Sequence, residues 1–294
     1  MNYSLLSAKL KQLPLNPYII NWYQSFLHER QQRVLSGNRV CTWKAVNKGT
    51  TQGSVSGPHL FNVFLNDLNI FYNEVPALFK YADDSTIIAP VSSNSDPSDR
   101  LVELFLNWSR GNNMICNPSK CKELVVRKKY NNTQYEQICN IPQCNSLSFL
   151  RVTLQSNCKL NEHVRQKLVK ANRCLHVLRS LRKEQYSQVE IDHLFKSLVL
   201  PNFTYCLSVY GGSEPDLNCI QHFLGPCRKR CFVSFPVSIK DLLYKQDCTI
   251  LKAITSVDNH PLATNLPAKK ENNCNLRKEQ CVLPKDNTER FMTS

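Results

Sequence analysis

The segment ALFKYADDSTIIAP, residues 77–90, constrains the fold more than any other part of the chain, because two apolar runs flank a pair of adjacent acids. This pattern predicts a β-hairpin that turns at Asp83 and Asp84. Two adjacent carboxylates repel each other and favour a cation between them, so the pair is a candidate metal site. An ordinary Asx turn in a solvated hairpin would use the same residues, and the segment by itself leaves both readings open.

Around this hairpin, the first half of the chain mixes short strands with helices. Apolar residues at helical spacing predict two helices within residues 2–30, a third from about 58 to 71 and a fourth that begins near Leu101. Alternating residues in 31–48 predict another hairpin, which turns near Gly37.

The second half is mostly helical from about residue 160. Residues 160–183 place apolar side chains on one face and a row of Lys and Arg on the other. We therefore expect an α+β protein with a mixed domain at 1–155, a helical region at 156–260 and a polar, basic and loose tail at 261–294.

The charge balance narrows the class of partner. The 294 residues contain 37 Lys plus Arg against 23 Asp plus Glu, a net charge of +14. Such an excess favours polyanions, nucleic acid first and an anionic membrane second. Because we find neither an apolar stretch of roughly 20 residues nor a signal-peptide layout, we expect an intracellular protein of the cytoplasm or nucleus that does not enter a membrane. The 14 Cys are then expected to be reduced thiols.

A small-residue loop precedes the third predicted helix. It reads Gln52-Gly53-Ser54-Val55-Ser56-Gly57-Pro58. Such a loop allows the backbone to approach a flat or phosphorylated ligand closely. A plain helix start with Pro in the first turn would explain Gly57-Pro58, but it leaves Gln52-Gly53 unexplained.

Together, and in this order, the loop and the acidic hairpin resemble the palm of a reverse transcriptase of the non-long-terminal-repeat type, as in LINE-type, jockey-like retrotransposons. Further segments are similar to that family at 61–68 (FNVFLNDL), 108–122 (WSRGNNMICNPSKCK) and 149–154 (FLRVTL), where Arg151 stands in place of the usual Gly. The resemblance covers nearly residues 1–260. It implies a partial, incomplete palm in the first domain, with a small antiparallel sheet and helices, followed by a helical thumb and post-thumb region.

The resemblance also implies roles for the hairpin. Asp83 would bind a catalytic Mg²⁺ or Mn²⁺ ion, Asp84 would support that site, and Tyr81 and Ala82 would lie beneath the primer end. The chemistry is two-metal nucleotidyl transfer, in which carboxylates keep both ions in place.

Three more residues take implied roles outside the hairpin. Gln52 and Gly53 would border the incoming nucleotide and the template, and Lys120 fits the position proposed to protonate the leaving pyrophosphate. The implied partners are an RNA template, a DNA primer and deoxynucleoside triphosphates.

A third carboxylate is harder to find. In the family it lies upstream of the Gln-Gly loop, whereas residues 1–66 contain no Asp and a single acid, Glu29, which reads as a surface ion-pair residue beside His28 and Arg30. We therefore expect an N-terminally truncated enzyme that lacks its first catalytic Asp and its fingers and has little or no activity alone.

Two other functions stay open. A nucleic-acid-binding protein without catalysis would use the basic face of the 160–183 helix, with Arg165, Lys167, Lys170 and Arg173 on backbone phosphates. A zinc-stabilised interaction module would instead use the His222, Cys227 and Cys231 side chains.

Overall fold

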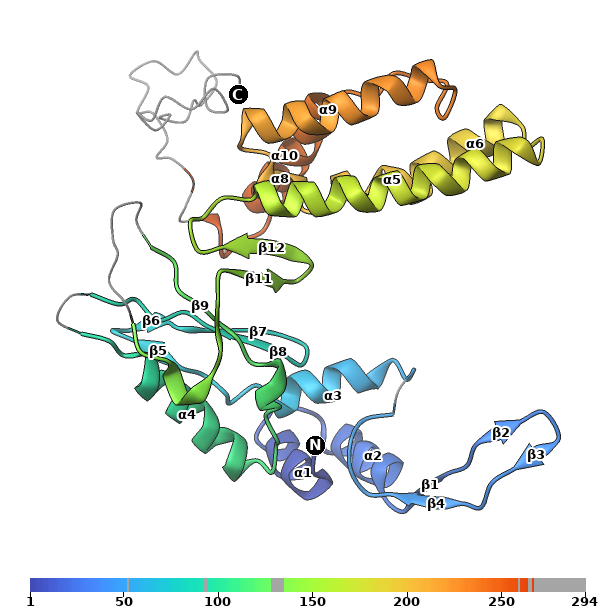
Figure 1. Cartoon of the computed structure of the whole chain (residues 1–294). Coiled ribbons are helices and arrows are strands. Elements are labelled where there is room, and N and C mark those ends of the chain that lie inside the picture. The colour runs from blue at the N-terminus through green and yellow to red at the C-terminus, as the bar shows by residue number, and fades with distance from the viewer. Residues whose placement is uncertain (52, 93–94, 128–134, 259, 264–265, 267–294) are drawn as a thin grey trace, which may run out of the picture. The chain divides into compact units, whose positions relative to one another are not determined.

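The computed structural model describes residues 1–51, 53–92, 95–127, 135–258, 260–263 and 266 (Figure 1). Its contacts divide the chain into two compact units, one from Met1–Glu123 and Asn132–Cys144 and the other from Leu124–Asn131 and Asn145–Ser294. Each unit has its own hydrophobic core. Among the described helices, none is both long enough and apolar enough to cross a membrane.

The first unit opens with the two expected helices. Helix α1 (Tyr3–Lys11) begins after Asn2, whose side chain accepts hydrogen bonds from the Ser4 and Leu5 N–H groups. Helix α2 (Pro17–Leu27) has Asn16 as its cap and Pro17 in its first turn, where the missing N–H costs nothing.

The expected hairpin of residues 31–48 is confirmed. Strand β1 (Arg30–Gln32) pairs with β4 (Lys44–Val46), and β2 (Leu35–Ser36) pairs with β3 (Arg39–Val40), all antiparallel. Gly37 takes a φ of +56° at the turn between β2 and β3, a conformation that glycine adopts without steric cost.

Helix α3 (Ser56–Phe64) is shorter than the expected 58–71. The rest of the first unit consists of short elements: β5 (Phe71–Tyr72), β6 (Val75–Pro76), β7 (Leu78–Tyr81), β8 (Asp84–Ile87), α4 (Ser98–Gly111), η1 (Pro118–Lys120), β9 (Glu123–Leu124, which ends in the second unit), η2 (Ile138–Asn140) and β10 (Gln143–Cys144). Buried side chains of α1, α3 and α4, among them Leu6, Phe64 and Leu101, form its core.

The second unit is mostly helical, as expected. It contains the hairpin β11 (Ser146–Phe149) and β12 (Val152–Gln155), and then α5 (Asn161–Lys183), α6 (Gln188–Leu194), η3 (Phe195–Val199), α7 (Pro201–Thr204), α8 (Leu207–Tyr210), α9 (Glu214–Lys229) and α10 (Ile239–Ser256). Its core joins α5 to the later helices through residues such as Leu178, Phe203 and Ile220.

The β11–β12 hairpin belongs to the second of these compact units, whose longer segment begins at Asn145, and the domain bounds at 155 and 260 stay predictions. The Thr153 N–H donates to His163 Nδ1 at 3.1 Å, and Thr153 Oγ1 lies 2.9 Å from Gln166 Oε1. These bonds tie β12 to α5. The names palm and thumb stay predictions, and most of the 261–294 tail lies outside the described residues.

Strands in the described residues form six separate two-stranded ladders rather than one small sheet. The α+β class is therefore confirmed in its coarse form, as helices combined with small sheets.

Candidate catalytic hairpin and nucleic-acid interface

The acidic segment forms the expected hairpin. Strands β7 and β8 are antiparallel, with Leu78 opposite Ile87 and Tyr81 opposite Asp84. This register leaves Ala82 and Asp83 as a two-residue loop, in which Ala82 takes a φ of +52°. Positive φ at the loop residues is what twists a two-residue turn to match its strands. The turn therefore places both acidic residues at the tip of the hairpin.

Both Asp83 and Asp84 are exposed. Neither side chain accepts a hydrogen bond from another described residue, so the Asx-turn reading is not what the chain builds. Oxygen atoms of this kind suit a hard divalent cation, which takes carboxylates together with water. Within the described residues, however, no three His, Cys, Asp or Glu side chains gather as a metal site. The hairpin thus offers two ligand side chains and no third.

Lys80 anchors the hairpin, and sequence reasoning missed it. Its Nζ donates to the Leu65 and Leu68 carbonyls at 2.8 and 2.7 Å, just past the end of α3. The residue as a whole is exposed, but partial burial of its ammonium group lowers the pKa of Lys80, and nearby Asp67 partly opposes that shift. The only sequence signal was a lysine within an apolar strand.

The Gln-Gly loop is described only in part. Gln52 lies outside the described residues. Gly53 has a φ of +81°, and apart from its two chain neighbours no described residue has an atom within 4 Å of the position that a Cβ would take there. Close approach of a ligand to Gly53 stays a prediction.

Lys120 is exposed at the end of η1. Its backbone N–H donates to the Asn117 carbonyl at 3.1 Å. No bond within the described chain joins Lys120 to the hairpin acids, so its proposed role stays a prediction. Glu29 is exposed and its Oε2 lies 3.8 Å from His28 Nδ1, which confirms it as a surface residue.

Helix α5 carries the expected basic face with one correction. Arg165, Lys170 and Arg173 are exposed, but Lys167 is only 8% exposed, so its placement on that face was wrong. Lys167 lies three residues after Val164 and four before Ala171, both buried, and helical periodicity therefore turns it inward. Its Nζ lies 5.4 Å from the Tyr205 ring centroid.

The surroundings of Lys167 and Arg165 reduce the positive charge that α5 presents to a ligand. Burial and then the nearby Lys170 charge lower the pKa of Lys167. Arg165 donates twice to Glu162, at 2.7 and 2.8 Å, and these bonds lower the pKa of Glu162 to about 2. Among the cations of α5 that are exposed, those without an ion pair to a described residue therefore begin at Lys170.

His163 is the second functional candidate that sequence reasoning missed. It is 1% exposed, its Nδ1 accepts from Thr153, and its ring lies 4.9 Å from that of Tyr210 in an edge-to-face arrangement. Its Nε2 is buried and has no hydrogen-bond partner among the described residues. Burial, followed by the charges of Lys167 and Lys170, lowers the pKa of His163 to about 4. The imidazole is therefore neutral at neutral pH.

The zinc hypothesis is wrong. Cys227 is buried and its Sγ donates to the Phe223 carbonyl at 3.2 Å, whereas His222 is exposed. Burial raises the pKa of the Cys227 thiol to about 11, which disfavours the thiolate that zinc needs. With Cys231, these side chains do not form a metal site.

Comparisons with known proteins identify a family whose matching region includes the acidic hairpin. Residues 2–178 match the family model described as reverse transcriptase (RNA-dependent DNA polymerase). The chain is 24% identical over 216 residues to "Probable RNA-directed DNA polymerase from transposon X-element" of Drosophila melanogaster, with 70% of this chain and 24% of that protein covered. It is 25% identical over 236 residues to "RNA-directed DNA polymerase from mobile element jockey" of Drosophila funebris, with 74% and 25% covered.

The chain thus spans about a quarter of the length of the curated relatives it matches. No solved structure matches it. The family model covers more than half of the 294 residues and includes the whole acidic hairpin together with the first part of α5. The chain belongs to the reverse transcriptase family.

Proposed function

We propose that this chain is a nucleic-acid-binding part of a retrotransposon reverse transcriptase, and that Asp83 and Asp84 are two of the metal ligands for RNA-templated DNA synthesis. The observation that carries the proposal is the β7–β8 turn, which presents two exposed carboxylates with no hydrogen bond from the described residues. A bound Mg²⁺ or Mn²⁺ would activate the primer hydroxyl and hold the triphosphate.

The chain's own residues give this hairpin its form. Lys80 fixes the strand that leads into the turn through two carbonyls at the end of α3. Tyr81 pairs with Asp84 across the ladder, so the proposed platform for the primer end and the second acid move together. Fixed positions of this kind are what phosphoryl transfer requires, because its catalysis is mostly positioning and electrostatic stabilisation.

Two carboxylates alone would hold one ion loosely. Because a metal contributes several kcal/mol to phosphoryl transfer, loss of a bridging carboxylate should slow the reaction roughly a thousandfold or more. We therefore propose that the 294 residues by themselves bind primer and template but extend the primer at background level.

Metal binding tests the role of the acids directly. Titration of the protein with Mn²⁺, followed by the electron paramagnetic resonance signal of the free ion, should show one weak site. The double substitution Asp83→Asn with Asp84→Asn should remove it. Glu103→Gln removes an exposed carboxylate of α4 and should leave the site unchanged. Equal Mn²⁺ binding by the asparagine variant would contradict the proposed ligands.

Primer extension tests the proposed lack of activity. With an RNA template, a DNA primer and deoxynucleoside triphosphates, the protein and its Asp83→Ala variant should both stay at background. Extension that depends on Asp83 would show that another group completes the site.

The exposed cations of α5 favour a second candidate function, nucleic-acid binding without catalysis. Affinity for an RNA–DNA duplex should fall with salt, with a log–log slope of roughly −3 to −5. Lys170→Gln should reduce that slope by about 1, since each phosphate contact releases counterions. Lys167→Met, which alters a buried lysine of the same helix, should leave the slope unchanged. A flat salt dependence would contradict binding through phosphates.

A further inference from the structure

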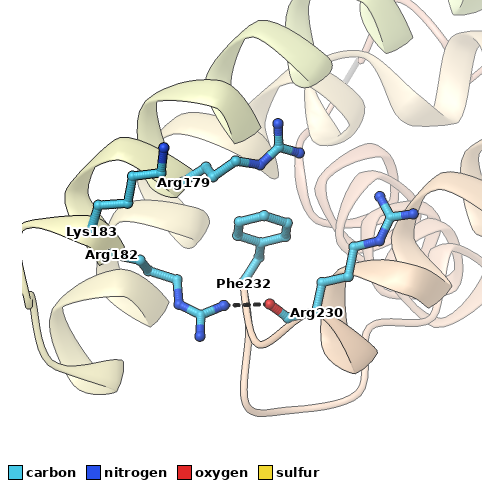
Figure 2. A pocket seen from close by; sticks show the side chains of 5 residues that line it. All are labelled: Arg179, Arg182, Lys183, Arg230 and Phe232. Atoms are coloured by element: carbon cyan, nitrogen blue, oxygen red, sulfur yellow. Dashed lines mark hydrogen bonds between the residues drawn. The ribbon is translucent and has the colours of Figure 1, made fainter.

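Two segments far apart in the sequence line an open, strongly basic hollow on the surface of the second unit. It has a volume of about 450 Å³ and is lined by Arg179, Arg182, Lys183, Arg230 and Phe232 (Figure 2). The first three residues come from the end of α5, and the other two follow α9. We refer to it as the Phe232 hollow.

The end of α9 determines where Phe232 lies. Cys231 takes a φ of +54°, and its N–H donates to the Arg228 carbonyl at 2.9 Å. The Phe232 N–H donates to the Cys227 carbonyl, also at 2.9 Å. These two bonds are those of a Schellman motif, which ends a helix and turns the chain sharply. The motif sends Phe232 into the core, where it is 3% exposed.

Contacts between the two segments hold the cations around the ring. The Arg182 guanidinium donates to the Arg230 carbonyl. The guanidinium carbons of Arg179 and Arg182 lie 5.9 and 6.0 Å from the Phe232 ring centroid, and Figure 2 shows the guanidinium groups of Arg179, Arg182 and Arg230 around that ring. The Ser234 N–H also donates to Asp192 Oδ1 at 2.8 Å, which fixes the segment after Phe232 to α6. The hollow is thus formed before any ligand arrives.

The charge of the hollow is not balanced by acids among the described residues. Its lining contains four cations and no acid, and none of the four forms an ion pair with any residue in the described part of the chain. The negative C-terminal ends of the α5 and α9 dipoles neutralise some of this positive charge, because both helices end at the hollow. Each helix end supplies only about half a negative charge, however, and two such ends leave most of the positive charge unbalanced.

We infer that the Phe232 hollow binds successive backbone phosphates of a nucleic-acid strand. Arginine forks bind phosphate oxygens in pairs, and three of the four cations are arginines. The Phe232 ring is too buried to stack on a base, so the hollow recognises phosphate rather than sequence. The inference rests on the proposed function in that nucleic acid is the partner. Free polyphosphate shares the same chemistry.

Charge reversal within the hollow tests the inference on the full chain. The probe is a labelled DNA primer annealed to a longer RNA template, followed by fluorescence anisotropy. Arg179→Glu with Arg230→Glu should weaken binding at least tenfold and reduce the log–log salt slope by about 2. Lys245→Glu with Lys252→Glu makes the same charge change on exposed positions of α10 that do not line the hollow, and it should change affinity by less than about threefold.

The outcomes separate this inference from the proposed function. If the unmodified protein binds the primer–template and the Arg179/Arg230 variant binds equally well, the hollow is not a contact, while nucleic-acid binding stands. If the unmodified protein does not bind the primer–template at all, both fail. If inorganic tripolyphosphate binds the protein and is lost in the variant while primer–template affinity is unchanged, the site takes free polyphosphate and the backbone assignment is wrong. Equal ellipticity at 222 nm confirms that each variant is folded.

Discussion

At the level of single residues, a buried imidazole links the β11–β12 hairpin to α5. His163 has a pKa of about 4 in the folded chain, against an ordinary value of 6.5. Between about pH 4 and pH 6.5, His163 is therefore mostly protonated in the unfolded chain and mostly neutral in the folded chain. Stability should be constant above about pH 6.5 and should fall as the pH drops toward 4, by at most about 3 kcal/mol.

Urea unfolding followed by ellipticity at pH 7.5 and pH 5 measures this dependence. His163→Asn can still accept from the Thr153 N–H but does not titrate in this range, so the variant should lose most of the difference between the two pH values. The lowered pKa of Glu162 acts at lower pH, below its ordinary value of 4.5, and does not interfere. An unchanged pH dependence in the variant would assign the effect to another group.

A second residue-scale prediction concerns the turn between β11 and β12. Leu150 and Arg151 both have positive φ, 45° and 66°, so the hairpin is tight although Arg151 replaces the glycine usual at such turns. Arg151→Gly should stabilise the second unit by about 1 kcal/mol, because it relieves a left-handed residue and removes a charge that disfavours protonated Lys167. Arg151→Ala removes the charge but keeps the strain, so in urea unfolding it should give a smaller gain. Equal gains would show that charge alone matters.

At the level of elements, the acidic hairpin depends on one lysine for its position. Lys80→Met leaves two carbonyls without their charged donor and should destabilise the first unit by about 2 kcal/mol. Lys44→Met removes an exposed lysine from β4 and should cost less than about 0.5 kcal/mol. Urea unfolding followed by tryptophan fluorescence measures both, and similar values for the two variants would mean that Lys80 does not anchor the hairpin.

The elements also show how far the sequence could predict this structure. Patterns that repeat within one element, such as the alternation around Gly37 and the amphipathic 161–183 segment, were sufficient to find the strands and the helix. The early end of α3 was not predictable in this way, because lysines from two other elements, Lys9 and Lys80, bond the carbonyls at its end.

The same distinction, between local patterns and contacts distant in sequence, applies to the candidate site. The two acids were found because they adjoin in sequence, and the position of Lys167 could have been found from a count against Val164 and Ala171. The Phe232 hollow could not, because it requires the end of α5 to meet the end of α9. Contacts distant in sequence leave no local pattern.

At the level of the whole molecule, two separate cores predict two unfolding transitions. The three tryptophans, Trp22, Trp43 and Trp108, all lie in the first unit, whereas the long helices lie in the second. Thermal unfolding followed by tryptophan fluorescence and by ellipticity should therefore give different midpoints.

Core substitutions provide the matched pair of controls. Leu60→Ala should lower the fluorescence midpoint and Leu178→Ala the ellipticity midpoint, since each removes about 2–5 kcal/mol from its own core. A shift of both midpoints by either substitution would show that the units unfold as one.

The separate ladders have a consequence for how the protein behaves at high concentration. Since each described ladder has only two strands, every strand in it is an edge strand with one row of backbone groups unpaired within its ladder. Several of these strands carry exposed apolar side chains, such as Leu35, Val40 and Phe79. Open, apolar edges are templates on which a strand from a second chain can add. We therefore expect this chain to self-associate through added strands when it is concentrated. Its net charge of +14 opposes that association through electrostatic repulsion.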